Sequence, residues 1–136
     1  MHSGKPIPVI LDTDIGGDID DTWALAFLLR CPELDPKLVV TDFVNNDYRT
    51  RIAAKLLNTA GRNGIPVATG VTAGKEATTG AQEPWIAGYR LGDYPGTVHQ
   101  DGVKAIIETI MSSPDPVTLI AIGPAPNIRT ALEIEP

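Results

Sequence analysis

The chain has 136 residues, of which 43% are hydrophobic and 21% charged, the size and composition of one folded domain. Its formal charge is −6, from 17 acidic and 11 basic side chains, and no basic block could hold phosphates, so the sequence disfavours nucleic-acid binding. No apolar stretch is long enough for a membrane span or a leader peptide, and the one cysteine, Cys31, excludes an internal disulfide, so we expect a cytoplasmic protein without membrane contact.

The first half of the chain alternates short apolar runs with helical patterns. A short apolar run that ends in an aspartate predicts a buried strand at residues 8–12. A stretch rich in helix-forming residues then predicts a helix at 20–30, which stops before a proline. A β-branched run predicts a second strand at 38–43. Apolar residues at helical spacing then predict a helix at 48–60, and a brief third strand follows at 65–68.

The second half begins with a segment that has no sustained period. Residues 70–102 are rich in glycine, threonine and proline with scattered aromatics, which predicts a long loop. Helical spacing returns at 103–111, with Asp101 as the expected cap. A strand is then predicted at 117–122 and a helix that starts with proline at 126–134.

Strands that alternate with helices predict an α/β fold. Right-handed crossovers give a mostly parallel sheet with helices on both faces, here as a single domain over residues 1–136. Ligands of such sheets bind at the carboxyl ends of the strands. The residues that the pattern places at these ends are Asp12, Asp14, Asn45 and Ile122.

Five of the seventeen acids lie within ten residues, at Asp12, Asp14, Asp18, Asp20 and Asp21. Without them the balance is 12 acids against 11 bases, so the acidity is local. Helix capping accounts for one or two of these carboxylates but not for five. Because crowded carboxylates repel one another, a divalent cation with oxygen ligands is the simpler interpretation.

Two other cation-site patterns share features with this loop. An EF-hand counted from Asp12 fails, because Gly16 replaces a ligand and Trp23 stands where the bidentate glutamate belongs. Phosphatases of the haloacid dehalogenase type also begin with two aspartates spaced by one residue after a strand. In that interpretation Gly16 is unusual and the pair Asp20-Asp21 has no role, but the pattern leaves it open.

The ordered motifs resemble those of the inosine-uridine preferring nucleoside hydrolase family. Asp12-Thr13-Asp14 follows the first strand, and Asp20-Asp21 opens an aliphatic helix after a spacing that is similar to one branch of the family. Further matches are Val44-Asn45 after the second strand, the helix at 51–62, the segment Val98-His99-Gln100-Asp101-Gly102, and the Gly-Pro-x-x-Asn turn within 120–127. The resemblance implies a Rossmann-like fold and the N-terminal portion of an enzyme that cleaves ribonucleosides into ribose and base.

The resemblance also implies roles for individual residues and Ca²⁺ as the cofactor. Asp14 would be the general base and a calcium ligand, with Asp21 and the carbonyl of Ile122 as further ligands. Asp20 and Asn45 would bind the ribose. The remaining two residues, Asp12 and His99, would support the site from behind, and Asp18 has no assigned role.

The family's chains are about twice as long, so the resemblance implies that this chain is truncated and that further ligands lie in the missing half. We therefore expect weak hydrolysis, or none, from these 136 residues alone. The alternative is a non-catalytic remnant that binds calcium or ribose. A homo-oligomer formed through an exposed sheet edge is the expected partner arrangement for such a remnant.

Overall fold

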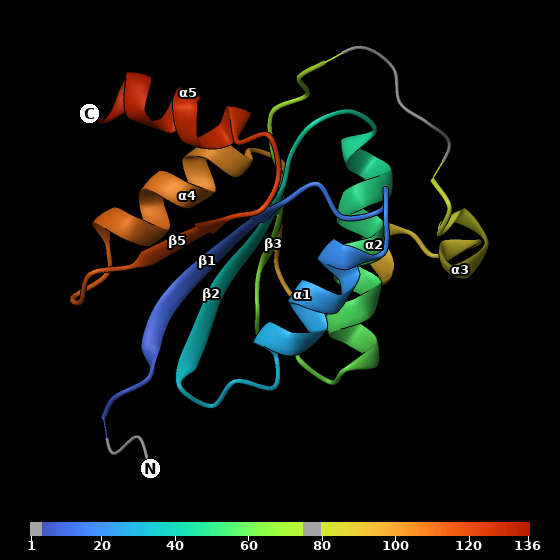
Figure 1. Cartoon of the computed structure of the whole chain (residues 1–136), viewed down its shortest axis with the longest axis horizontal. Helices are drawn as coiled ribbons and strands as arrows, with labels where there is room; N and C mark the ends of the chain where they lie inside the picture. The colour runs from blue at the N-terminus through green and yellow to red at the C-terminus, as the bar shows by residue number, and fades with distance from the viewer. Residues whose placement is uncertain (1–3, 75–79) are drawn as a thin grey trace.

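The computed structural model describes residues 4–74 and 80–136, which form one layer of sheet between two layers of helix (Figure 1). All pairings are parallel, and the strand order is β4-β3-β2-β1-β5. This confirms the predicted α/β fold. The strands are β1 (Ile7–Thr13), β2 (Leu34–Thr41), β3 (Val67–Thr69), β4 (Val98–His99) and β5 (Thr118–Ala121).

The helices cover both faces of this sheet, as Figure 1 shows. Two lie on one face, α1 (Asp20–Leu28) and α2 (Asn46–Thr59), and two on the other, α4 (Gly102–Met111) and α5 (Pro126–Ile134). None of the helices in the described ranges is long and apolar enough to cross a membrane.

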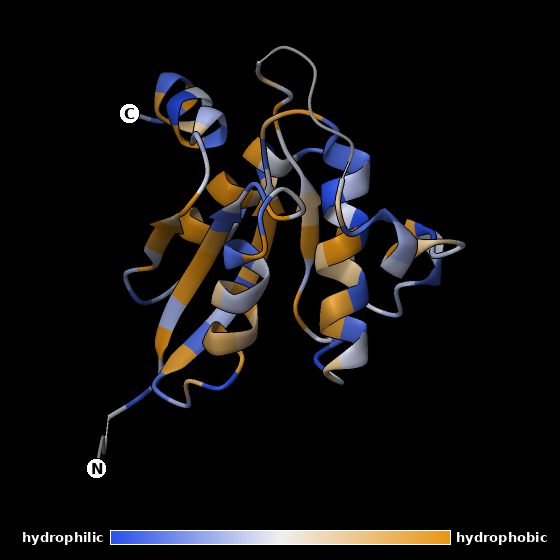
Figure 2. Ribbon diagram, turned by 45° about the vertical axis from the view of Figure 1, so that its right-hand side comes forward, coloured by the Kyte–Doolittle hydropathy of each residue, from blue (hydrophilic) through white to orange (hydrophobic). Residues whose placement is uncertain are grey.

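Alternation along the two central strands builds both halves of the core. Val9, Leu11 and Val39 face α1 and α2, while Ile10 and Val40 face α4 and α5. Each of these side chains is at most 2% exposed, as expected for parallel strands covered on both faces. Figure 2 shows the resulting hydrophobic strands, with helices of mixed hydropathy beside them.

The second strand begins and ends earlier than the predicted range of 38–43. It begins at Leu34 and accommodates Pro36 where the register with β1 shifts, between Val9 and Ile10. A proline cannot donate to the ladder, so its tolerance at this irregularity was not visible from the apolar pattern. The strand ends at Thr41 because the backbone of Phe43 turns into the left-handed region, with φ of 73°.

The segment predicted as a loop contains three short elements. These are α3 (Glu83–Ile86), the 3-10 helix η1 (Leu91–Asp93) and β4. Such short elements leave no period in a sequence; residues 75–79 of the same predicted loop lie outside the described residues. The hydroxyl of Tyr94 donates to the carbonyl of Ile65 at 2.6 Å, so this aromatic anchors the segment to the core.

Candidate functional site

The carboxyl end of β1 delivers a fully buried carboxylate, Asp12, which is 0% exposed. Its Oδ1 accepts a hydrogen bond from Nδ2 of Asn127 at 2.8 Å, and its Oδ2 has no partner among the described residues. Burial raises the pKa of Asp12 to about 6; the bond from Asn127 lowers it and the charge of Asp14 raises it. The strand end therefore holds an incompletely satisfied acid next to a second one.

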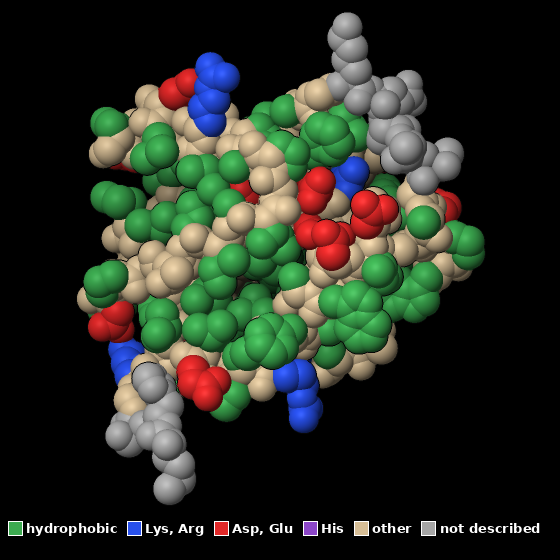
Figure 3. Space-filling view, in the orientation of Figure 1, with side chains coloured by type: hydrophobic (Ala, Val, Ile, Leu, Met, Phe, Trp, Pro, Cys, Tyr) green, Lys and Arg blue, Asp and Glu red, His purple; other side chains and the backbone are tan. Residues whose placement is uncertain are grey.

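The amino end of α1 delivers another buried carboxylate, Asp21, which is 7% exposed. Oδ2 of Asp21 accepts a hydrogen bond from the hydroxyl of Thr13 on β1. Burial raises the pKa of Asp21 to about 6, and Asp14 and Asp20 raise it further against the opposing bond from Thr13. The structure thus brings Asp14, Asp20 and Asp21 within electrostatic reach of one another, and Figure 3 shows acidic side chains gathered over the amino end of α1.

The loop between these acids is held by Tyr48 from α2. Its hydroxyl donates to the carbonyl of Gly16 at 2.9 Å and accepts from the backbone N–H of Gln82 at 3.1 Å. Gly16 has φ of 111°, and a Cβ there would lie 2.6 Å from the Tyr48 ring. Only glycine fits, which explains the turn that joins the two acidic clusters.

Asp42 is a site residue that the sequence argument missed. It follows β2 as Asp14 follows β1, because Thr13 and Thr41 are partners in the parallel register. Its side chain is 0% exposed, with Oδ2 accepting from the Ala125 N–H at 2.9 Å and Oδ1 without a partner among the described atoms. The repeated Thr-Asp pair at two strand ends was the signal that could have identified it.

The pKa of Asp42 is raised to about 7, mainly by burial and then by the charge of Asp12. The N–H of Ala125 lowers it, Asp14 raises it, and Arg49 lowers it. Asp42 is therefore the carboxyl that most resists ionisation in this group when no cation is added.

The turn between β5 and α5 closes the site from the other side. The Ile122 N–H donates to the carbonyl of Asp12 at 2.9 Å, which places Ile122 beside the end of β1. A Cβ on Gly123 would lie 2.6 Å from Oδ1 of Asp42 and 3.0 Å from the Asp14 nitrogen. Asn127, the asparagine of the Gly-Pro-x-x-Asn turn, had no role assigned from the sequence. It is 0% exposed, and its Nδ2 donates to both Asp12 and the Thr41 carbonyl.

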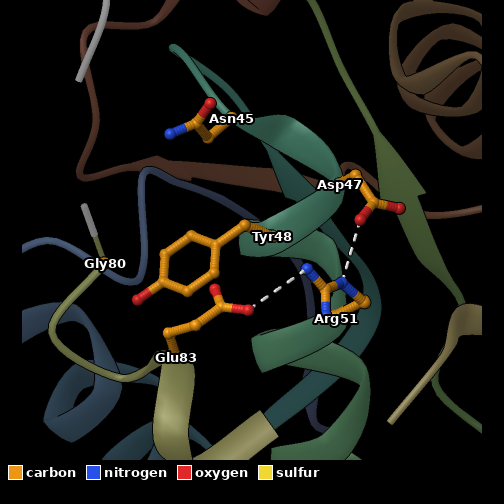
Figure 4. A pocket seen from close by; sticks show the side chains of 6 residues that line it. All are labelled: Asn45, Asp47, Tyr48, Arg51, Gly80 and Glu83. Atoms are coloured by element: carbon orange, nitrogen blue, oxygen red, sulfur yellow. Dashed lines mark hydrogen bonds and ion pairs between the residues drawn. The ribbon is translucent and has the colours of Figure 1, made fainter. Parts of the chain in front are cut away.

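Asn45 stands exposed at the N-cap position of α2, in a left-handed conformation with φ of 55° and no side-chain cap bond. It lines a cavity of about 410 Å³ together with Tyr48 and Glu83 (Figure 4). In this close-up the Asn45 amide points away from the group formed by Tyr48, Glu83 and Arg51. This cavity contains none of the strand-end carboxylates, so the ribose contact of Asn45 stays a prediction.

The structure does not bring His99 next to the carboxylates. His99 pairs with Ala68, Ala68 with Val40, and Val40 with Asp12. These residues form one row across the sheet, and three strand spacings of about 4.8 Å separate His99 from Asp12 by roughly 14 Å. The supporting role of His99 therefore remains a prediction. Any effect of His99 on the carboxylates would have to pass through the residues between them.

In residues 4–74 and 80–136, no group of three or more His, Cys, Asp or Glu side chains is arranged to hold a metal ion. The expected ligand set is of another kind, because it combines two carboxylates, Asp14 and Asp21, with one main-chain carbonyl. The relevant observation is instead that two neighbouring buried carboxylates, Asp12 and Asp42, each keep an oxygen without a hydrogen bond from the described residues.

A parallel sheet with an acidic loop between β1 and α1 is the arrangement expected of a nucleoside hydrolase. The chain belongs to the inosine-uridine preferring nucleoside hydrolase family, which it matches over residues 9–136. This confirms the resemblance. It also assigns the acidic loop to that family and removes the haloacid dehalogenase interpretation.

Curated relatives and a solved structure agree with this assignment. The chain is 37% identical over 134 residues to the non-specific ribonucleoside hydrolase RihC of Escherichia fergusonii and to that of Shigella sonnei. In both comparisons the match covers 93% of this chain and 43% of the relative, so the chain spans less than half of their length. A plant nucleoside hydrolase, the PpNRh1 enzyme, superposes with a TM-score of 0.75 at 30% identity, over 97% of this chain and 44% of that one.

Proposed function

We propose that this chain provides the metal- and ribose-binding part of an enzyme that hydrolyses the N-glycosidic bond of ribonucleosides. The observation that carries the proposal is the convergence of Asp12, Asp14, Asp21 and Asp42 at neighbouring strand and helix ends. The relatives are named as non-specific ribonucleoside hydrolases, which supports the same reaction and substrate class.

A calcium ion fits the chemistry of these donors. Burial raises the pKa of Asp12, Asp21 and Asp42, so a positive charge nearby would stabilise their ionised forms. Hard cations prefer oxygen ligands. Asp14, Asp21 and the carbonyl of Ile122 would hold the ion. When bound, calcium would orient a water molecule, make it more acidic and bind vicinal hydroxyls.

The other catalytic and binding roles would fall to side chains of the chain itself. Asp14 would accept a proton from the attacking water as a general base. Asp20 and Asn45 would hold the ribose hydroxyls, so that C1′ faces the water while the bond to the base breaks. Asp12 would not contact the ribose. It would help to orient the acidic loop, through the hydrogen bond that it accepts from Asn127.

We further propose that the 136 residues alone turn over slowly, because the matched relatives contain more than half of their length outside this match. The second candidate is a binding protein without catalysis, which the same carboxylates support. A cytoplasmic location is consistent with the free thiol of Cys31.

Calorimetric titration of the purified chain with CaCl₂ tests the cation site. We expect one site, with affinity reduced at least about tenfold by Asp14→Asn or Asp21→Asn, since each removes a charged ligand. Asp18→Asn is the matched control, because Asp18 is exposed in the same loop and has no proposed role. Wild-type chain that binds no calcium at millimolar concentration would contradict the proposal.

A ribose-release assay with inosine and uridine, with and without calcium, separates the two candidates. Slow calcium-dependent release that Asp14→Asn abolishes supports the hydrolase. Calcium binding with no release at all supports the binding protein. Rapid release would show that these residues suffice for catalysis, against our expectation.

A further inference from the structure

A buried arginine, Arg49 on α2, lies behind the acidic loop and is not used by the proposed chemistry. Its side chain is 5% exposed, although arginine is rarely buried unless it is paired. Among the ion pairs in the described ranges, none includes Arg49. Its Nε and Nη1 donate instead to backbone carbonyls.

Those carbonyls belong to two separate strand ends. Nη1 of Arg49 donates to the carbonyls of Asp14 and Ile15, the latter at 3.1 Å, after β1. Nε donates to the carbonyl of Val44 at 2.7 Å, after β2. The planar fork of a guanidinium can hold several acceptors in one fixed geometry, which a lysine ammonium cannot reproduce.

The second of these strand ends is conformationally demanding. Val44 lies between Phe43 and Asn45, whose φ angles are 73° and 55°. Left-handed conformations of residues other than glycine are uncommon and persist when their surroundings enforce them. The bond from Arg49 to the Val44 carbonyl, and the position of its guanidinium 5.6 Å from the centre of the Phe43 ring, supply such enforcement.

We propose that Arg49 is a positioning residue that fixes the acidic loop and the Asn45 turn relative to each other. With the main-chain carbonyls of Asp14 and Ile15 held by Arg49, the carboxylate of Asp14 is the group left to face the ligand. One side chain thereby sets the spacing between a calcium ligand and a ribose contact. The roles of Asp14 and Asn45 in this inference rest on the proposed function. The positioning of the loop by Arg49 can be tested without metal.

Amide hydrogen exchange of the metal-free chain is the first test. The Ile15 N–H donates to the hydroxyl of Thr13 within the loop, so Arg49→Lys should speed its exchange by about tenfold or more. The Val39 N–H donates to the Pro66 carbonyl and not to the loop, so it should keep its rate. Unchanged exchange at Ile15 would overturn the proposal.

Arg62→Lys is the matched control, since Arg62 also donates to a backbone carbonyl, that of Leu29 at 3.0 Å, outside the loop. It should leave the exchange of Ile15 unchanged. If Arg49→Lys does not fold, proton exchange of the arginine side chains in the wild-type chain still tests the proposal. The Arg49 Nε proton must exchange much more slowly than that of Arg129, whose side chain is 82% exposed, and equal rates would overturn the proposal.

Calcium affinity distinguishes positioning from a simple effect of charge. Positioning predicts that Arg49→Lys and Arg49→Met both weaken calcium binding, by about tenfold, as is typical when partners behind metal ligands are removed. If Arg49 acted only as a positive charge, Arg49→Lys would bind as the wild type does and Arg49→Met more tightly, which would overturn positioning. A wild-type chain without calcium binding would reject the proposed function, while the exchange experiment would still decide the role of Arg49.

Discussion

At the scale of single residues, the main feature of this protein is a set of carboxyl groups that are buried before any cation is added. Asp12 and Asp42 are fully buried, and burial is the largest cause of the raised pKa of each. Such groups favour the protonated form. The folded, metal-free chain should therefore lose stability as these carboxyl groups ionise.

The pH dependence of stability follows from the sign of these shifts. The pKa of Asp42 rises from 3.8 to about 7 on folding, so the folded chain binds this proton more tightly than the unfolded chain does. Its stabilising contribution is present below about pH 4 and is lost as the pH rises to about 7. Urea unfolding of metal-free chain should therefore show a falling free energy of unfolding across that range.

Asp42→Asn is the variant that assigns this effect. It keeps an acceptor for the Ala125 N–H but cannot ionise, so the decline near neutral pH should become shallower. Glu33→Gln, at an exposed position before β2 and in no ion pair of the described ranges, should leave the slope as it is. Superimposable pH profiles for wild type and Asp42→Asn would contradict the assignment.

The close approach at Gly123 leads to a second residue-scale prediction. Gly123→Ala would place a methyl group 2.6 Å from Oδ1 of Asp42, so the turn between β5 and α5 must move away from the site. We expect a loss of about 1–3 kcal/mol in the free energy of unfolding, as for overpacking elsewhere, and weaker calcium binding. Both are measurable on one preparation by urea unfolding and calorimetry.

Gly64→Ala is the control for that experiment, because a Cβ at Gly64 would meet no atom within 4 Å. It should change the free energy of unfolding by less than about 0.5 kcal/mol, as expected for a surface substitution. Equal effects of the two substitutions would show that the space at Gly123 does not limit the site.

At the scale of elements, α4 gives the clearest link between sequence and structure. Asp101 was expected to cap this helix, and its side chain accepts a hydrogen bond from the backbone N–H of Lys104 at 3.0 Å. Asp101→Ala should therefore cost about 1 kcal/mol in urea unfolding, while Asp101→Asn, which can still accept the bond, should cost much less. Equal losses would mean that the cap bond does not stabilise α4.

Element patterns were informative where one periodicity continued long enough. The helices α1, α2, α4 and α5 and the strand β1 follow the predicted ranges closely, since each buries one regular face or run. The start of β2 was missed because Pro36 argues against a strand unless the register shifts at that point. The two residues of β4 are too few to produce a period and form a strand only because β3 offers its edge.

At the scale of the whole molecule, the edge of the sheet at β5 carries an apolar surface. Among the described residues β5 pairs only with β1, and an apolar groove of about 320 Å³ lies between α4 and α5. Its exposed apolar side chains include Met111 at 69% and Leu132 at 59%. Large exposed apolar surfaces with an unpaired strand edge are typical of an interface.

We therefore expect the 136-residue chain to self-associate. Sedimentation velocity should show a concentration-dependent increase in mass, and Leu132→Glu should shift the equilibrium towards monomer by placing a charge in the groove. Thr59→Glu, at an exposed position near the end of α2, is the control. A wild-type chain that stays monomeric at about 100 μM would exclude a homo-oligomer of useful affinity.

The sequence by itself determined the alternation of strands and helices, the family, and the placement of Asp12, Asp14 and Asp21 near one another. These are local properties, because periodicity, turns and the spacing of the acidic loop lie within short stretches of chain. Only the tertiary structure decided that Asp42, Arg49 and Asn127 belong to the same group. Each reaches the loop across 28 or more residues of sequence through strand register and helix packing, and no local pattern encodes which strand ends become neighbours.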